Sequence, residues 1–363
     1  MARETTADDA GRAASALTAA SAAVGLPLTE PVDLGGSERS LVLRARVAGR
    51  DDETVVVKQF VPRADDASAR ADATAGYVRE LVGLRTLDAA PDLLAHDDAN
   101  RLLVMTDAGT WPTLADLLLA PGTPEDRDLA WAESLSWAGA LGRTAARSAA
   151  LAPQVRRLLD EHGARDVDVV SPSDTCPDNA LRTPSGWTFL DLEGTSVHHL
   201  ALDAAYTLLP FATCWCVFEP PAGYPEALLA AFEEGAREHL PEVVDAARWR
   251  DEVLTACGAY VLALGAWLLA SADEDRPAVG PVGRSPSYRE LLVQRWRWSA
   301  ARLTEVLPAT AALCSSALTG AAQRWGTLPG PRALPGARRR LTHPGVPQVR
   351  FSDVPHTGFT VAA

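Results

Sequence analysis

Residues Ser171 to Asn179 read Ser-Pro-Ser-Asp-Thr-Cys-Pro-Asp-Asn, and Asp191 follows Asn179 by twelve residues. Within this stretch, Asp174 precedes Asn179 by five residues. An aspartate can orient or deprotonate an acceptor hydroxyl in phosphoryl transfer, which otherwise depends mainly on positioning and charge. Asn and Asp oxygens are ligands that suit Mg²⁺. The spacing therefore predicts a phosphotransfer site with Asp174 as the catalytic residue and with Asn179 and Asp191 as metal ligands.

A hairpin is predicted between the two metal-ligand candidates. The segment Thr183-Pro184-Ser185-Gly186 is a turn signal, and it separates residues 179–182 from residues 187–190. Closing this hairpin would bring Asn179 and Asp191 together.

Lys58 is the only lysine among 34 basic residues. It stands near the end of Thr54–Phe60, a β-branched run that predicts a central strand. An ammonium group is a compact point charge, whereas a guanidinium is a wide planar fork. All of the other basic residues are arginine, so the one lysine is a functional candidate.

The neighbouring segments predict a small sheet with a helix. Residues 32–47 predict two strands around the glycine turn Gly35-Gly36-Ser37, and residues 102–105 predict a further strand. Residues 68–87 have apolar side chains on one helical face, and Glu80 lies beside that face. Residues 114–159 and those beyond Leu200 are predominantly helical in pattern. The predicted fold class is α+β, with a small antiparallel sheet lobe and a larger helical lobe.

Taken together, these segments resemble the aminoglycoside phosphotransferase and choline kinase branch of the protein-kinase-like superfamily, over about residues 32–206. The resemblance implies that ATP and Mg²⁺ are used. It implies that Gly35, Gly36 and Ser37 cover the phosphates, that Lys58 contacts the α and β phosphates and pairs with Glu80, and that Met105, Thr106, Asp107 and Ala108 offer backbone groups to adenine.

The same resemblance assigns the rest of the site. It implies that Asp174 and Asn179 form the catalytic loop, that Asp191-Leu192-Glu193 is a metal-binding Asp-x-Glu, and that Asp203 braces the loop. The family usually has His-Gly before the catalytic Asp, whereas this chain has Pro172-Ser173. This departure leaves an altered or inactive site as an alternative.

Composition limits the other possibilities. The chain has 363 residues, and 47% of them are hydrophobic, which fits a globular enzyme and not a disordered chain. Its net charge of −13 disfavours nucleic acid as a partner. Its five cysteines have no paired CxxC spacing, which predicts neither a disulfide framework nor a zinc site and favours a reducing, cytoplasmic setting. Cys176 is interpreted as a packed, inert thiol, and the adjacent His198 and His199 are interpreted as structural.

Two segments bear on membranes and on the chain ends. Residues 253–272 are uncharged for 20 residues, but acidic flanks and internal glycines favour a buried core helix, so no membrane partner is predicted. The Ala-rich residues 1–25 predict a surface helix and lack the apolar stretch of a signal peptide. The Pro-, Gly- and Arg-rich residues 326–363 predict an extended tail.

The sequence therefore predicts an ATP-dependent transfer of the γ-phosphoryl group to a hydroxyl of a small molecule. The expected domains are a nucleotide-binding lobe at 1–108, a helical lobe with the acceptor site at 109–325, and the tail. Two alternatives stay open: a kinase that phosphorylates Ser or Thr of a protein or peptide, although no Ala-Pro-Glu follows Asp191, and a nucleotide-binding pseudokinase that regulates a partner. No motif identifies the acceptor or the oligomeric state.

Overall fold

The computed structural model describes residues 7–35, 39–50, 52–62, 66–120, 122–159, 167–209, 222–277 and 285–330. Gly36 and Ser37 of the predicted phosphate turn lie outside these residues, as does the predicted tail from residue 331 onward. The chain forms two compact units, residues 1–113 with 144–203 and residues 114–143 with 204–363. The predicted domain boundaries stay a prediction.

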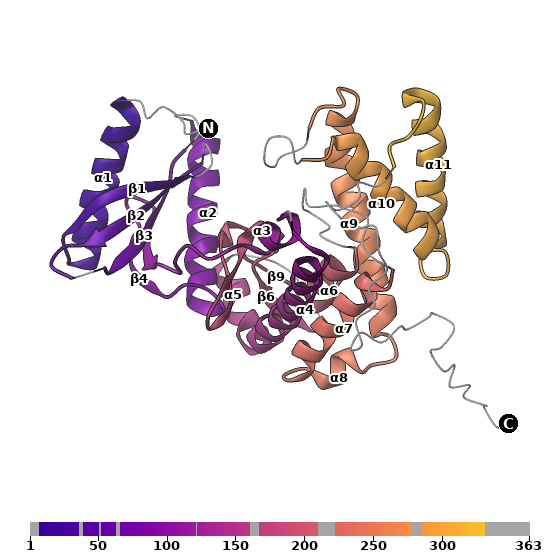
Figure 1. Ribbon diagram of the computed structural model, residues 1–363, viewed down its shortest axis with the longest axis horizontal. Helices are drawn as coiled ribbons and strands as arrows, with labels where there is room; N and C mark the ends of the chain where they lie inside the picture. The colour runs from indigo at the N-terminus through magenta and orange to yellow at the C-terminus, as the bar shows by residue number, and fades with distance from the viewer. Residues whose placement is uncertain are drawn as a thin grey trace. The chain divides into compact units, whose positions relative to one another are not determined.

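A five-stranded antiparallel sheet is the centre of the first unit (Figure 1). Its strand order is β1-β2-β3-β5-β4. The strands are β1 (Leu28–Gly35), β2 (Ser40–Val47), β3 (Thr54–Phe60), β4 (Leu93–Asp97) and β5 (Leu102–Thr106). The prediction that the strand carrying Lys58 is central is confirmed. The edge strand β4 was not predicted, because His96 and Asp97 interrupt its apolar pattern.

Helix α1 (Ala7–Val24) packs on one face of this sheet. Its Ala16 and Ala20 are buried in a cluster that includes Val55 and Val57 of β3. Alternate residues of a strand point to opposite faces, so Lys58 belongs to the other face. The predicted N-terminal helix is therefore present, and one side of it contributes to the core.

Helix α2 (Ala67–Thr86) supplies the residue that meets Lys58. Asp66 caps the start of this helix, because its carboxylate accepts a hydrogen bond of 2.8 Å from the Ala69 amide. The apolar side chains of Tyr77 and Leu81 are buried. Glu80 is buried with them and is only 2% exposed, which requires a partner for its charge.

Two short two-stranded antiparallel sheets follow in the same unit. Strands β7 (Ala180–Thr183) and β8 (Gly186–Phe189) form the predicted hairpin, in the register Ala180 to Phe189. Strand β6 (Asp168–Ser171) pairs with β9 (Ser196–His199), and this pairing was not predicted. Helix α5 (Ala152–Leu158) packs against β6. The polar stretch that contains Asp174 thus lies between β6 and β7.

The second unit is helical. Its elements are α3 (Leu114–Leu119), most of α4 (Pro124–Arg147), most of α6 (Leu200–Leu208), α7 (Tyr224–Arg237), α8 (Pro241–Val244), α9 (Trp249–Ala272), α10 (Tyr288–Arg302) and α11 (Pro308–Trp325). Helices α4 and α7 approach closely at glycines, since a Cβ on Gly142 would lie 2.1 Å from the Phe232 carbonyl oxygen. The antiparallel sheet followed by this helical part is the predicted two-lobed, protein-kinase-like α+β fold.

Helix α9 contains the long apolar stretch. Among the described residues it is the one helix long and apolar enough to cross a membrane, and such a helix is also common in the cores of soluble proteins. The buried residues of this helix include Val253, Cys257, Val261, Leu268 and Ala272, as the core-helix prediction requires. In its second half, however, Trp267 and Leu269 are exposed. The second half of α9 is therefore buried on one side and exposed on the other, and the core-helix prediction holds for the buried side only.

Candidate active site

Lys58 joins three elements of the first unit. Its Nζ donates to Glu80 Oε2 of α2 at 2.5 Å and to Asp191 Oδ1, after β8, at 2.6 Å. The Lys58 side chain is 6% exposed and that of Asp191 is 48% exposed. The ring of Phe60 lies beneath the ammonium, with its centroid 5.1 Å away. Lys58 is thus held at one well-defined point, with Asp191 facing outward from it.

The two buried charges respond differently to their surroundings. Burial acts to lower the pKa of Lys58, but the negative charges of Glu80 and Asp191 outweigh burial and raise that pKa well above its ordinary value. Burial raises the pKa of Glu80 to about 7, although Lys58 opposes this rise. Lys58 is therefore cationic at every physiological pH, and Glu80 is the member of the pair that titrates near neutrality.

Asp191 has a left-handed backbone conformation, with φ 53° and ψ 60°. The turn that follows it is anchored by Leu192, which is 1% exposed, and by Thr195, whose hydroxyl donates to the Leu192 carbonyl at 2.7 Å. Gly83 of α2 packs directly on this turn, because a Cβ there would lie 2.5 Å from Thr195 Oγ1. The position of Asp191 is thus set by close packing of the turn against the helix that carries Glu80.

The β7–β8 hairpin places Asn179 next to Asp191. The amide of Leu190 donates to the Asn179 carbonyl oxygen at 2.8 Å, so Asn179 lies opposite the residue that precedes Asp191. The side-chain amide of Asn179 donates to the Asp174 carbonyl at 3.2 Å. This contact uses the nitrogen of the amide and keeps its oxygen, the better metal ligand, for another partner. The hairpin therefore brings Asn179 next to Asp191, as predicted, and Asn179 also contacts Asp174.

Asp174 is exposed on the loop between β6 and β7. Its amide donates to the Pro172 carbonyl at 2.8 Å, and its Oδ1 accepts from the Cys176 amide at 3.3 Å. Both contacts are local and hold the loop rather than bury the carboxylate. An exposed carboxylate next to Asn179 is suitably placed to meet a hydroxyl that arrives from solvent.

The oxygen ligands of Asn179 and Asp191 suit a magnesium ion that is coordinated by both protein and phosphate oxygens. Over the described residues there is no group of three or more His, Cys, Asp or Glu side chains that could hold a metal ion. Asn179 and Asp191 nevertheless supply hard oxygen ligands, and Mg²⁺ commonly takes one or two protein ligands and completes its shell with water and phosphate oxygens. Lys58 already occupies one oxygen of Asp191.

The predicted adenine segment lies at the end of β5. Met105 is buried and pairs with Val56, while the Thr106 amide donates to the Asp92 carbonyl at 2.9 Å. The Asp107 carboxylate accepts from Arg44 and Thr54, and also from the Gly109 amide at 2.9 Å. Asp107 thus fixes the segment that follows β5 to the neighbouring strands. The roles of Met105 to Ala108, and of Gly35 at the end of β1, stay predictions.

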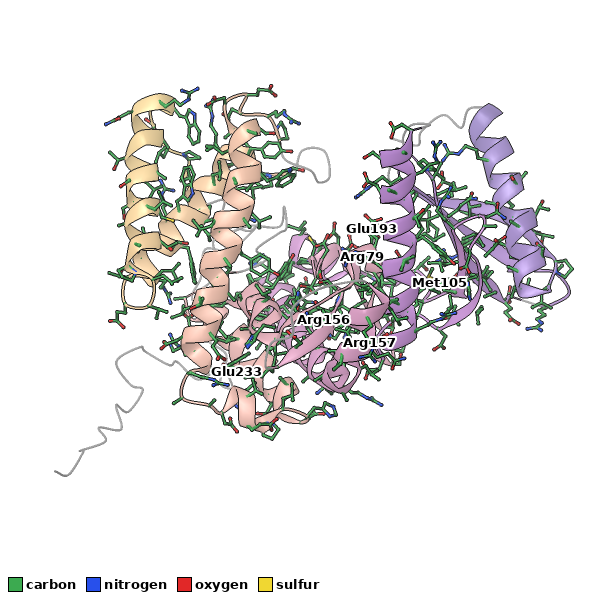
Figure 2. The ribbon with its side chains drawn as sticks, turned by 180° about the vertical axis from the view of Figure 1, so that it is seen from behind. Arg79, Met105, Arg156, Arg157, Glu193 and Glu233 are labelled. Carbon is green, nitrogen blue, oxygen red and sulfur yellow. The ribbon has the colours of Figure 1, made fainter. Side chains whose placement is uncertain are left out.

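Two arginine contacts in this region were not predicted. Arg39, the residue before β2, donates to Glu193 at 2.8 Å, and Arg79 of α2 donates to the Thr195 carbonyl at 2.6 Å. Figure 2 shows Arg79 and Glu193 close together beside α2. Both contacts tie the segment after Asp191 to the sheet and to the helix. With 33 arginines in the chain, no local pattern distinguishes these two.

Cys176 also differs from expectation. The sequence predicted a packed, inert thiol, whereas Cys176 is disulfide-bonded in the structure. Cys257 and Cys314 are free and buried, as scattered cysteines usually are. Spacing along the chain carries no signal for a bond between cysteines that lack a paired motif.

No family model matches the chain, and no curated protein matches it. Among solved structures, the choline/ethanolamine kinase family protein of Mesorhizobium loti is similar with a TM-score of 0.42 and 16% identity, over 80% of this chain and 93% of that one. The choline kinase of Cryptosporidium parvum is similar with a TM-score of 0.41 and 9% identity, over 82% and 88%. An amicoumacin kinase in complex with AMP-PNP and Ca²⁺ is similar with a TM-score of 0.39 and 12% identity, over 87% of this chain and 94% of that one.

By name these three proteins are a choline kinase, a member of the choline/ethanolamine kinase family and an amicoumacin kinase. All of the identities are 16% or lower and all of the TM-scores are 0.42 or lower. The assignment of the fold therefore rests on the strand order, the position of Lys58 and the hairpin geometry described above.

Proposed function

We propose that the chain is an ATP-dependent phosphotransferase that transfers the γ-phosphoryl group to a hydroxyl of a small molecule. The observation that carries the proposal is the three-way contact of Lys58 with Glu80 and Asp191, with Asn179 and Asp174 adjacent on one hairpin and its loop. Phosphoryl transfer needs a fixed cation, oxygen ligands for a metal and a base. These residues supply all three.

Each residue has a definite task under this proposal. Lys58 binds a phosphate oxygen through its positive charge, and Glu80 holds the Lys58 ammonium in position. Asn179 and Asp191 would hold Mg²⁺, which when bound neutralises charge on the transferring phosphate. Asp174 accepts the proton of the acceptor hydroxyl, or orients that hydroxyl, on the exposed side of the loop. The buried partners keep these groups in place without reorganisation.

An acceptor screen that follows ATP consumption tests the proposal. We expect ADP formation that depends on a hydroxyl compound and on Mg²⁺, with transfer of the ³²P label from γ-labelled ATP to that compound. The first panel is amino sugars, amino alcohols and nucleosides, because the sequence leaves the acceptor open. The Asp174→Asn variant serves as the matched blank.

The same screen separates the alternatives. Label transfer to Ser or Thr of a peptide library, with none to metabolites, would make the chain a peptide kinase. Saturable ATP binding with no turnover under any acceptor would support a pseudokinase and would overturn the proposal.

A further inference from the structure

Behind the Asp174 loop, one buried carboxylate collects hydrogen bonds from two strands. Asp203 in the first turn of α6 is 1% exposed. Its Oδ1 accepts from Ser171 Oγ at 2.6 Å and lies 3.1 Å from His198 Nε2. Ser171 Oγ in turn accepts from the Ser173 amide at 2.8 Å. A hydrogen-bonded chain thus runs from His198 through Asp203 and Ser171 to the residue before Asp174.

Ser173, the last residue of this series of hydrogen bonds, has an unfavourable backbone conformation. Ser173 has φ 64°, in the left-handed region that favours glycine. For a residue other than glycine this conformation is unfavourable, so the surroundings must impose it. Besides the bond of its amide to Ser171, Ser173 has its hydroxyl 2.6 Å from Ser196 Oγ. The backbone that presents Asp174 is therefore held by neighbouring side chains and not by its own preference.

The pairing of β6 with β9 brings the partners together. Ser171 lies opposite Ser196, and Val169 lies opposite His198. Ser196 and His198 are two residues apart, so they share one face of β9. One face of a short strand therefore supplies both the hydroxyl that meets Ser173 and the imidazole that meets Asp203.

Asp203 depends strongly on these contacts. Within the described part of the chain, its second carboxylate oxygen is buried and has no hydrogen-bond partner. A buried carboxylate without donors is destabilising, and hydrogen bonds to a charged group contribute more to stability than hydrogen bonds between neutral groups. Removal of the His198 donor would leave Oδ1 with the Ser171 hydroxyl.

We propose that His198 is a positioning residue: together with Ser171 and Asp203 it fixes the conformation of the Asp174 loop. In this chain the loop itself has Pro172-Ser173 before Asp174, and the imidazole comes instead from β9. The inference rests on the proposed function for its effect on turnover, but the bracing of the loop stands independently of any reaction.

The proposal predicts a separation of turnover from nucleotide binding. A misplacement of about 1 Å can reduce a rate about 100-fold. We expect His198→Leu to lower kcat by about 10- to 100-fold, with KM for ATP changed by less than about threefold. His198→Gln keeps a side-chain N–H donor and should recover most of kcat. The control for general destabilisation is Leu43→Ala, which leaves a cavity in the core between the sheet and α1. This variant should be less stable than wild type but should keep the kcat of the folded molecules.

Amide hydrogen exchange tests the brace without any activity. We expect the segment 171–176 to exchange at least about tenfold faster in His198→Leu than in wild type, with His198→Gln near wild type and α1 unaffected. If His198→Leu fails to fold, the comparison of His198→Gln and Ser171→Ala with wild type decides in the same way.

The outcomes are distinct. Absence of phosphotransfer in the wild-type protein would defeat the proposed function, while the exchange measurement would still decide on the brace. Unchanged exchange in 171–176 together with kcat within twofold of wild type would overturn the positioning role of His198. Faster exchange throughout the first unit, with no recovery by His198→Gln, would also overturn it, because that pattern marks a general structural role.

Discussion

Lys58 Nζ and Asp191 Oδ1 lie 2.6 Å apart although 133 residues separate them in the chain. The contact joins the centre of the sheet to the end of the β7–β8 hairpin, where Asn179 lies alongside. Asp191 is about half exposed, so its contact with buried Lys58 links the interior to the solvent side of the site. The contact thus sets the cation and one candidate metal ligand directly beside each other.

The first prediction concerns the shape of the cation at position 58. Lys58→Arg keeps the charge, but a planar guanidinium needs different room from an ammonium held at 2.5 and 2.6 Å by two carboxylates. We expect kcat/KM for ATP to fall by at least about 100-fold, which corresponds to about 2.7 kcal/mol. Steady-state kinetics and calorimetric titration with a non-hydrolysable ATP analogue measure the change.

A conservative exchange elsewhere in the sheet is the control. Arg46→Lys alters an exposed basic residue of β2 that pairs with Glu30 and Asp52 at the surface. Exposed ion pairs contribute little, so this variant should match wild type. If Lys58→Arg also has the same kcat/KM for ATP as wild type, the site does not require a compact cation.

The second prediction is a pH dependence that comes from Glu80. Burial raises the pKa of Glu80 to about 7, so its carboxylate takes up a proton as the pH falls through neutrality. Lys58 then retains Asp191 as its charged partner. We expect kcat/KM for ATP to fall on the acid side with an apparent pKa near 7, and we expect this limb to be absent from Glu80→Gln.

The stability changes in the opposite direction. Between the ordinary value of 4.5 and about 7, the folded protein binds more protons at Glu80 than the unfolded chain does. The contribution of Glu80 to the free energy of unfolding is therefore fully present below 4.5 and is lost as the pH rises through about 7. Urea unfolding of wild type and Glu80→Gln at about pH 5 and about pH 8 measures this difference. An identical acid limb in both proteins would assign the titration to another group.

The third prediction separates two acids on one loop. Asp174→Asn removes the carboxylate next to Asn179, and we expect kcat to fall by about 100- to 10,000-fold with little change in nucleotide affinity. Asp178→Asn removes an exposed carboxylate from the same loop and should keep kcat within about threefold. A rapid-quench measurement of label transfer distinguishes the chemical step from product release. Full activity in Asp174→Asn would exclude this residue as the base.

The local patterns of the sequence were sufficient for much of this site. The β-branched run around Lys58 and the apolar face beside Glu80 each encode one element, and the turn signal at Thr183–Gly186 encodes the hairpin that brings Asn179 to Asp191. Pairing between distant segments is different, because no periodicity records it. The contact of β6 with β9, and hence that of His198 with Asp203, follows from tertiary structure alone.

The same limit applies to surface charge and to cysteine. Arg39 meets Glu193 across 154 residues, and its own segment shows only that it follows a glycine turn. The disulfide at Cys176 also has no sequence motif. The apolar stretch of α9 was correctly predicted to be helical, but composition could not indicate that the side chains of Trp267 and Leu269 are exposed.

The last prediction tests the packing behind Asp191. Alanine normally stabilises a helix relative to glycine by roughly 0.5–1 kcal/mol. At Gly83 of α2, however, the added Cβ would lie 2.5 Å from Thr195 Oγ1 and 3.0 Å from Leu192 Cβ. Thr195 is fully buried and bonded to the Leu192 carbonyl, so it cannot turn away without loss of that bond. We expect Gly83→Ala to lower the free energy of unfolding by about 1–3 kcal/mol.

Gly320→Ala is the matched control, because Gly320 lies in α11 with no atom within 4 Å of the added Cβ. This variant should raise the free energy of unfolding by roughly 0.5–1 kcal/mol. The Gly83 variant should also raise KM for Mg²⁺, since movement of Leu192 shifts the adjacent Asp191. Denaturant unfolding of both variants, with Mg²⁺ titrations of activity, measures the two effects. Equal stabilisation by both substitutions would show that the turn after Asp191 yields freely and does not fix the metal ligand.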